Sequence, residues 1–283
     1  MNRYIKHLFN KLRVEKITPI TVPVLSGNLL LDRKALITGG NRGIGFAIAD
    51  AFIKNGASVI ITGRNKEALL AAKTKLISEN NCPENSVNFF VIDNSQEINE
   101  DILRTFLIES GKIDILVNNA GIMNGCDYFD CTQENFDNVI STNLKSTFFI
   151  SQVFSKYMID NKIPGNILNI CSSSCIRPGD SPYVLSKWSM RALTLGLAEK
   201  LLPYNIIVNG LAPGPTATDM LGKTGNNSLF LKTKPLGRFI LPEEIANLAV
   251  VLVSKLGTIV VGDTLFATGG SALLTQDISY KHL

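Results

Sequence analysis

Thr38-Gly39-Gly40-Asn41-Arg42-Gly43-Ile44-Gly45 is a glycine-rich turn between a short apolar run, residues 35–38, and a segment with apolar residues at helical spacing. The pattern predicts a strand, a turn and a helix in succession. Glycine allows backbone dihedrals and close approaches that a Cβ would block, and the free amides that open a helix form an anion site. We expect this unit to bind a pyrophosphate. A tight turn without a ligand is the alternative.

A second motif lies far downstream, where Tyr183 and Lys187 stand four residues apart within residues 181–188. On a helix, residues i and i+4 share a face. The Lys187 ammonium would therefore lie close enough to favour the ionised form of the Tyr183 phenol. Such a tyrosine can donate a proton to a carbonyl oxygen.

Six further strand-like runs alternate with helical patterns along the chain, which predicts a parallel sheet covered by helices on both faces. The expected class is therefore α/β, a Rossmann-type, doubly wound and mostly parallel sheet of seven strands. Ligands of such sheets bind in the crevice at the carboxyl ends of the strands. Motif residues follow several strands, so one crevice can collect them. The six runs are residues 58–62, 87–92, 113–117, 166–170, 205–209 and 264–267.

Composition and charge suit one large domain with a basic N-terminal arm. The chain has 283 residues, 45% of them hydrophobic and 18% charged, enough for a single core. We expect an arm over residues 1–33 and one dinucleotide-binding domain over residues 34–283. No apolar stretch reaches the roughly 18 to 20 residues of a membrane span, and no signal-peptide block opens the chain. We therefore expect a cytoplasmic protein.

The arm holds most of the positive charge, with seven basic and two acidic residues up to Lys34, against a net charge of +4 for the whole chain. The rest is almost neutral, and nothing in it indicates nucleic-acid binding. Apolar residues at helical spacing within the arm would allow contact with anionic lipid or with a partner subunit. An arm that packs on its own body or is partly frayed is the alternative. The apolar residues are Ile5, Leu8, Phe9 and Leu12.

The five cysteines are odd in number and have no zinc-site spacing, so we expect reduced thiols and no metal.

Six motifs in this order resemble those of the short-chain dehydrogenase/reductase family in its single-domain form, from about Lys34 to the C-terminus. They include the family's Thr-Gly-x-x-x-Gly-x-Gly, Asn-Asn-Ala-Gly and Tyr-x-x-x-Lys patterns. Members that reduce 3-oxoacyl thioesters are similar overall, and so are reductases of sugars, polyols and steroids. The matching residues are Gly39, Gly43 and Gly45; Asn118 to Gly121; Asn143; Ser172; Tyr183 and Lys187; and residues 213–218.

The resemblance implies roles for four residues. Tyr183 is the general acid and base, and Lys187 holds the cofactor ribose and lowers the tyrosine pKa. Ser172 hydrogen-bonds the substrate oxygen, with Ser173 and Ser174 as alternatives. Asn143 anchors a water that connects Lys187 with solvent; a helix-capping or core amide is the alternative. Cys175 stands where many members have glycine.

The cofactor is expected to be NADP(H) rather than NAD(H). No carboxylate follows the second predicted strand, where NAD-dependent proteins usually carry one. Arg64 stands there instead, suited to a 2′-phosphate, and Arg42 approaches from the glycine turn. Two ordinary solvated arginines are the alternative. The expected cofactor contacts are Gly39, Asn41, Arg42, Gly43, Ile44, Gly45, Arg64, Asp93, Asn119, Ala120, Gly121, Tyr183, Lys187, Pro213, Gly214, Thr216 and Thr218.

These features predict a carbonyl reductase or alcohol dehydrogenase. A sensor or scaffold that binds dinucleotide without turnover is the alternative. The resemblance also implies a homo-oligomer formed through the helices of Asn143 and Tyr183 and the C-terminal strand. We expect a tetramer, and a dimer is the alternative. The apolar residues 250–253 and 259–261 suit such an interface. Residues 221–230 should form a lid, with Met123, Ile176, Arg177 and Pro182 near the substrate pocket. The substrate itself is left open, because fold and motif do not separate these reductases.

Overall fold

One sheet of seven parallel strands forms the centre of the computed structural model, which describes residues 26–222, 229–231 and 234–273. The strand order is β3-β2-β1-β4-β5-β6-β7, and each neighbouring pair is parallel. The expected fold class is confirmed. The strands are β1 (Lys34–Ile37), β2 (Ser58–Gly63), β3 (Val87–Val91), β4 (Ile115–Asn118), β5 (Gly165–Ile170), β6 (Ile206–Pro213) and β7 (Thr264–Ala267).

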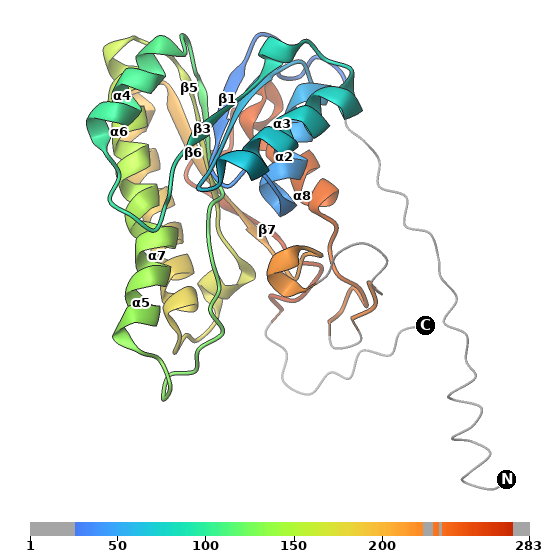
Figure 1. Ribbon diagram of the computed structural model, residues 1–283. Coiled ribbons are helices and arrows are strands. Elements are labelled where there is room, and N and C mark those ends of the chain that lie inside the picture. Colours follow the sequence, from blue (N-terminus) through green and yellow to red (C-terminus); the bar gives the residue numbers. More distant parts are fainter. Residues whose placement is uncertain (1–25, 223–228, 232–233, 274–283) are drawn as a thin grey trace, which may run out of the picture.

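Helices cover both faces of the sheet (Figure 1). α2 (Gly43–Lys54), α3 (Lys66–Asn80) and α8 (Pro242–Val253) share one core with it, whereas α4 (Glu100–Glu109), α6 (Ser146–Asp160) and α7 (Pro182–Leu201) share the other. A sheet buried on both faces needs strands that are apolar throughout, which is why continuous apolar runs predicted them. α5 (Gln133–Ile140) leads into α6 through a π-helical turn, Ser141–Lys145. Short 3-10 helices are Glu84–Ser86, Ser173–Ile176, Leu202–Tyr204, Asp219–Leu221 and Lys255–Gly257.

The chain reverses its direction across the sheet between β1 and β4. After β3 at the edge it returns through α4 to β4, on the other side of β1. Connections that leave two adjacent strands in opposite directions open a crevice at their carboxyl ends. Thr38 joins the two strand ends there, because its Oγ1 accepts hydrogen bonds from the Asn119 and Ala120 amides at 2.9 and 3.0 Å.

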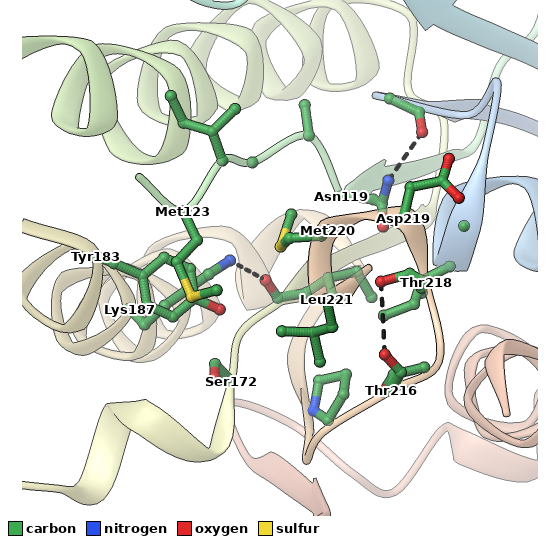
Figure 2. A pocket seen from close by; sticks show the side chains of 18 of the residues that line it. Asn119, Met123, Ser172, Tyr183, Lys187, Thr216, Thr218, Asp219, Met220 and Leu221 are labelled. Carbon is green, nitrogen blue, oxygen red and sulfur yellow. Dashed lines mark hydrogen bonds between the residues drawn. The ribbon is translucent and has the colours of Figure 1, made fainter. Parts of the chain in front are cut away.

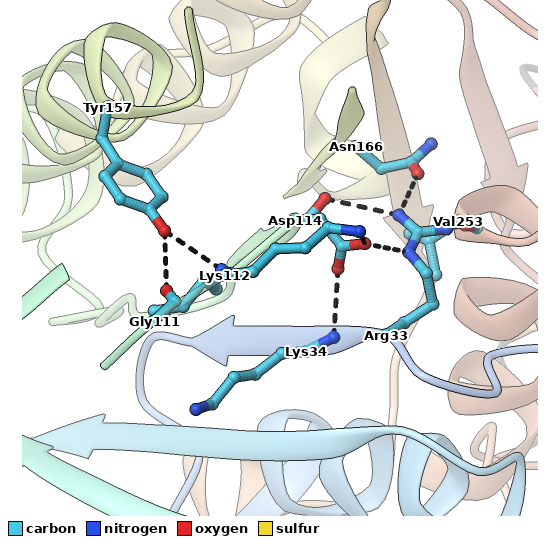
Figure 3. Close-up of polar contacts among 9 residues, drawn as sticks. Arg33, Lys34, Gly111, Lys112, Asp114, Tyr157, Asn166 and Val253 are labelled. Carbon is cyan, nitrogen blue, oxygen red and sulfur yellow. Dashed lines mark hydrogen bonds and ion pairs between the residues drawn. The ribbon is translucent and has the colours of Figure 1, made fainter. Parts of the chain in front are cut away.

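An ionic network closes the opposite end of the sheet (Figure 3). The buried carboxylate of Asp114 accepts from Arg33 Nε at 2.6 Å and from the Lys34 amide at 3.0 Å. Arg33 also donates to Asn166 Oδ1 at 2.9 Å. The sequence predicts β4 from Ile113, but the strand begins at Ile115, because the Ile113 amide donates to Tyr157 Oη at 3.2 Å and Asp114 joins this network.

The last residues of the predicted arm pack on the α/β body. Leu30 is fully buried, and its amide donates to Asn55 O at 2.9 Å. The Gly27 amide donates to Lys54 O at 3.1 Å. Residues 1–25, which include the predicted amphipathic helix, lie outside the described residues. Among the helices of the described chain, none is long and apolar enough to cross a membrane.

We therefore expect a chain that begins at Asp32 to be less stable than one that begins at Ser26. Burial of a leucine contributes about 1.5–3 kcal/mol, and only the shorter chain loses Leu30. Thermal unfolding should give a lower Tm for the shorter chain and for full-length Leu30→Ala, whereas kcat at 25 °C should be unchanged. Equal Tm values for the two truncated chains would contradict this packing.

Candidate active site

A cavity of about 700 Å³ lies at the carboxyl ends of the central strands (Figure 2). It brings together nearly all the residues that sequence motifs singled out. Among the predicted catalytic residues and cofactor contacts, only Gly45 and Asn143 do not line it. The predicted residues that do are Gly39, Asn41, Arg42, Gly43, Ile44, Arg64, Asp93, Asn119, Ala120, Gly121, Ser172, Tyr183, Lys187, Pro213, Gly214, Thr216 and Thr218.

The glycine turn has the backbone that an anion site requires. Gly39 and Gly43 have φ angles of 63° and 56°, in the left-handed region that favours glycine. α2 begins at Gly43, and its first turn contains no acidic residue. Its opening amides and the positive end of the helix dipole suit a pyrophosphate.

Gly45, the third residue of α2, has a packing role. A Cβ at this position would lie 2.5 Å from Gly39 O and 2.5 Å from Asn119 Nδ2. Asn119 Nδ2 in turn donates to Thr38 O at 2.9 Å and to Gly39 O at 3.1 Å. Gly45 therefore lets the helix approach the ends of β1 and β4, and it shapes the turn without reaching the cavity.

We expect Gly45→Ala to weaken NADP(H) binding by about tenfold. The added methyl group meets a backbone carbonyl that cannot move without the turn, and the turn positions the anion-binding amides. The measurement is the NADPH dissociation constant from fluorescence titration. Gly196→Ala is the matched control, because a Cβ there meets open space within α7. An unchanged dissociation constant for Gly45→Ala would show that the turn tolerates the methyl group.

Two arginines mark one end of the cavity. Arg64 follows β2 directly, and it forms no ion pair with any residue that the structure describes. Arg42 Nη1 lies 3.7 Å from Asp219 Oδ2, and both side chains are exposed. The residue after Arg64, Asn65, is an amide and not a carboxylate; its side chain accepts from the Ala68 amide at 2.6 Å and caps α3. This end fits a 2′-phosphate.

Asp93 lines the same part of the cavity, within a tight turn after β3. Its Oδ1 accepts from Ser95 N at 2.9 Å and from Ser95 Oγ at 2.7 Å. The side chain therefore orders its own loop, and no helix begins there.

Tyr183 and Lys187 lie one turn apart near the start of α7, and both line the cavity (Figure 2). Lys187 is buried, and its Nζ donates to Ile170 O at 2.8 Å. The same Nζ lies 5.9 Å from the centre of the Tyr183 ring. The shared helical face expected from the i, i+4 spacing is confirmed.

Ser172 follows the end of β5 and also lines the cavity (Figure 2). Its Oγ accepts from the Ser174 amide at 3.1 Å, which leaves its hydroxyl proton available to a substrate oxygen. Ser173 and Ser174 line the cavity as well, so the cavity contains all three candidate serines. Burial raises the pKa of the neighbouring Cys171 thiol to about 12, so this cysteine is no nucleophile at neutral pH.

Asn143 lies in the π-helical turn between α5 and α6 and is buried. Its Oδ1 accepts from the Ile122 amide at 2.8 Å, and its Nδ2 donates to Ile122 O at 3.0 Å. A Cβ on Gly121 would lie 3.3 Å from Asn143 Oδ1 and 3.8 Å from Lys187 Nζ. Asn143 therefore holds the loop after β4 beside Lys187. π-helical turns are frequent at functional sites.

The substrate side of the cavity differs in part from expectation. Met123 and Arg177 line it, but Ile176 and Pro182 do not. Ile176 packs instead on a small buried cluster around Cys171, and Pro182 is buried at the first turn of α7. Residues 223–228 of the predicted lid lie outside the described residues. Lining residues that sequence reasoning missed include Thr142, Met220, Leu231, Lys234 and Phe239.

Comparisons of the sequence with known proteins give a consistent result. The profile of the short chain dehydrogenase family matches residues 33–228. The chain is 35% identical over 243 residues to gluconate 5-dehydrogenase of Gluconobacter oxydans, covering 84% of this chain and 93% of the relative. It is 36% identical over 249 residues to a 3-oxoacyl-acyl-carrier-protein reductase of Chlamydia pneumoniae, covering 85% and 97%.

Solved structures are similar in fold as well. A gluconate 5-dehydrogenase from Burkholderia cenocepacia, solved in complex with NADP and tartrate, superposes with a TM-score of 0.77 at 31% identity. The match covers 86% of this chain and 96% of that one.

Proposed function

The chain belongs to the short-chain dehydrogenase/reductase family, and we propose that it transfers a hydride between NADP(H) and a ketone or secondary alcohol. One observation carries the proposal. Tyr183, Lys187 and Ser172 line the same cavity as the glycine turn and Arg64. A proton donor and a dinucleotide-binding turn thus share one site.

The residues have separate tasks in the proposed reaction. The nicotinamide supplies the hydride when bound. Tyr183 donates a proton to the carbonyl oxygen, and in the reverse direction it accepts one from the alcohol. Ser172 hydrogen-bonds the same oxygen and stabilises the charge that develops on it. Lys187 binds the cofactor ribose, and Asn143 holds a water that connects Lys187 with solvent.

The preference for NADP(H) rests on charge. Arg64 has no ion-pair partner among the described residues, and Arg42 has one exposed carboxylate at 3.7 Å. A guanidinium fork binds a phosphate through two parallel hydrogen bonds. The related gluconate 5-dehydrogenase from Burkholderia cenocepacia was solved with NADP, which supports the same choice here.

The test is NADPH oxidation at 340 nm across acyl thioesters, keto sugars, oxo acids and simple ketones, with NADP⁺ reduction by the corresponding alcohols. At least one class should be turned over. Tight NADPH binding without turnover of any class would favour the alternative of a sensor or scaffold.

We also propose that the protein is a homotetramer. Apolar side chains on α5, α6 and α7 are exposed, as are those around β7. Exposed apolar surface of this kind marks interaction sites. Light scattering should give several times the mass of one 30.8 kDa chain; a monomer at micromolar concentration would contradict the proposal. The exposed residues include Phe136, Phe148, Leu185, Trp188, Leu195, Ile259, Val261 and Leu265.

Part of the sequence argument for this interface was wrong. Val250, Leu252 and Val253 of α8 are buried in the core that α8 shares with α2, so they offer no surface to a second subunit. The cytoplasmic location and the membrane contact of the arm stay predictions.

A further inference from the structure

Two cationic side chains line the substrate side of the cavity, and we propose that they bind the carboxylate of an oxo acid or hydroxy acid substrate. They are Arg177 and Lys234. The inference rests on the proposed function, because it names the class of carbonyl compound that Tyr183 protonates.

Arg177 is held beside the catalytic helix. It directly follows the 3-10 helix Ser173–Ile176, and its carbonyl accepts a hydrogen bond from Trp188 Nε1 at 2.7 Å. Trp188 is the residue after Lys187 on α7. The backbone of Arg177 is therefore fixed to α7, the helix that carries Tyr183, and both residues line the cavity.

Lys234 lines the same cavity from a segment that lies later in the sequence. It lies in a turn closed by hydrogen bonds from Lys234 N to Leu231 O at 3.1 Å and from Gly237 N to Lys234 O at 2.8 Å. The turn packs on residues 269–270, because Leu236 N donates to Gly269 O at 3.1 Å. The next residue, Ser271, accepts through its carbonyl from Arg177 Nη2. One short segment thus holds both cations.

No acidic residue balances these two cations on the described part of the wall. The acids that line the cavity are Asp93 and Asp219. Asp93 accepts hydrogen bonds from Ser95, and Asp219 pairs with Arg42 at the glycine turn. Neither Arg177 nor Lys234 forms an ion pair within the described chain. A concave wall with unbalanced positive charge attracts anions.

A carboxylate fits this wall better than an uncharged group. Arg177 uses one nitrogen on Ser271, and the remaining N–H groups can bind two carboxylate oxygens. Five apolar residues of the same cavity suit the carbon chain between carboxylate and carbonyl. These residues are Met123, Met220, Leu221, Leu231 and Phe239.

The test uses pairs of ketones that differ only in a carboxylate replaced by CH₂OH. The pairs are acetoacetate and 4-hydroxy-2-butanone, 4-oxopentanoate and 5-hydroxy-2-pentanone, and 5-keto-D-gluconate and L-sorbose. With NADPH, the acid of the best pair should have a kcat/KM at least roughly tenfold higher. Arg177→Met and Lys234→Met should each lower kcat/KM for the acid by roughly tenfold and leave the neutral ketone within about threefold.

Matched variants separate charge from structure. Arg177→Lys keeps the charge and should retain part of the preference. Lys255→Met removes an exposed cation outside the cavity, and it should leave kcat/KM unchanged for both the acid and the neutral ketone. Arg177→Met loses the bond to Ser271 and could fail to fold for that reason. In that case Lys234→Met tests the carboxylate site alone, because the Lys234 side chain has no hydrogen bond in the described structure whose loss would disturb folding.

Equal kcat/KM values for acid and neutral ketone, or variants that lower both alike, would overturn the carboxylate site and leave the proposed function intact. A higher kcat/KM for dihydroxyacetone phosphate than for all three acids would show that the two cations bind a phosphate. This result would also overturn the carboxylate site. If none of these ketones is reduced with NADPH, the proposed function itself would be refuted.

Discussion

Tyr183→Phe should lower kcat by at least roughly 10² to 10⁴, the usual contribution of general acid catalysis, and leave the NADPH dissociation constant nearly unchanged. The substitution removes only the phenolic oxygen, which makes no hydrogen bond to other described residues. The ring keeps its place in the first turn of α7, and Lys187 keeps its bond to Ile170 O. The enzyme should therefore fold and bind cofactor, but it should lack its proton donor.

The control for this variant is Tyr204→Phe, which removes a hydroxyl from an exposed tyrosine outside the cavity. Steady-state kinetics and NADPH fluorescence titration on both variants separate turnover from binding. Near-normal kcat for Tyr183→Phe on any good substrate would mean that another group donates the proton.

The second large effect concerns the choice of cofactor. We expect kcat/KM with NADPH to exceed that with NADH by roughly ten-fold to more than a hundred-fold, because charge-assisted hydrogen bonds contribute about 1.5 to 3 kcal/mol. NADH leaves Arg64 solvated at little cost, so the preference is a gain with NADPH. Arg64→Ala should remove most of the ratio by weakening NADPH and leave NADH almost unchanged.

Arg42→Ala should act in the same direction but less strongly, because Arg42 already has Asp219 nearby. Arg104→Ala is the matched control, an exposed arginine that pairs with Asp160 on the outside of the molecule. Equal kcat/KM for the two cofactors in the unmodified enzyme, or an Arg64→Ala variant that keeps its preference, would refute the assignment.

Local sequence was enough to predict the sheet, because parallel strands covered on both faces must be apolar along their whole length. The starts and ends of strands were less predictable. Asp114 ends up in an ion pair with Arg33, which is distant in sequence, and β6 continues to Pro213 because it pairs there with Ala267. Contacts between segments far apart in the chain decide such boundaries.

Site residues could be predicted from the sequence where a motif identifies them. They were predicted less well where tertiary packing determines which residues line the cavity. The spacing of Tyr183 and Lys187 placed both on one face of a helix. The motifs of Asn143 and Gly45 name these residues but not their surroundings. They do not indicate that Asn143 lies in a π-helical turn, or that Gly45 packs on Asn119 and does not face the cavity. Lys234 was missed because no motif includes it, and only the packing of its turn on residues 269–270 brings it to the cavity.

The most direct test of the account follows the hydride itself. NADPH with deuterium at both C4 positions of the nicotinamide is incubated with the enzyme and the best carbonyl substrate, and the product is analysed by mass spectrometry and NMR. One deuterium should appear on the new carbinol carbon, and labelling with Tyr183→Phe should be at least roughly 10²-fold slower. An enzyme that binds the labelled cofactor but transfers no deuterium to any carbonyl compound would contradict the central claim.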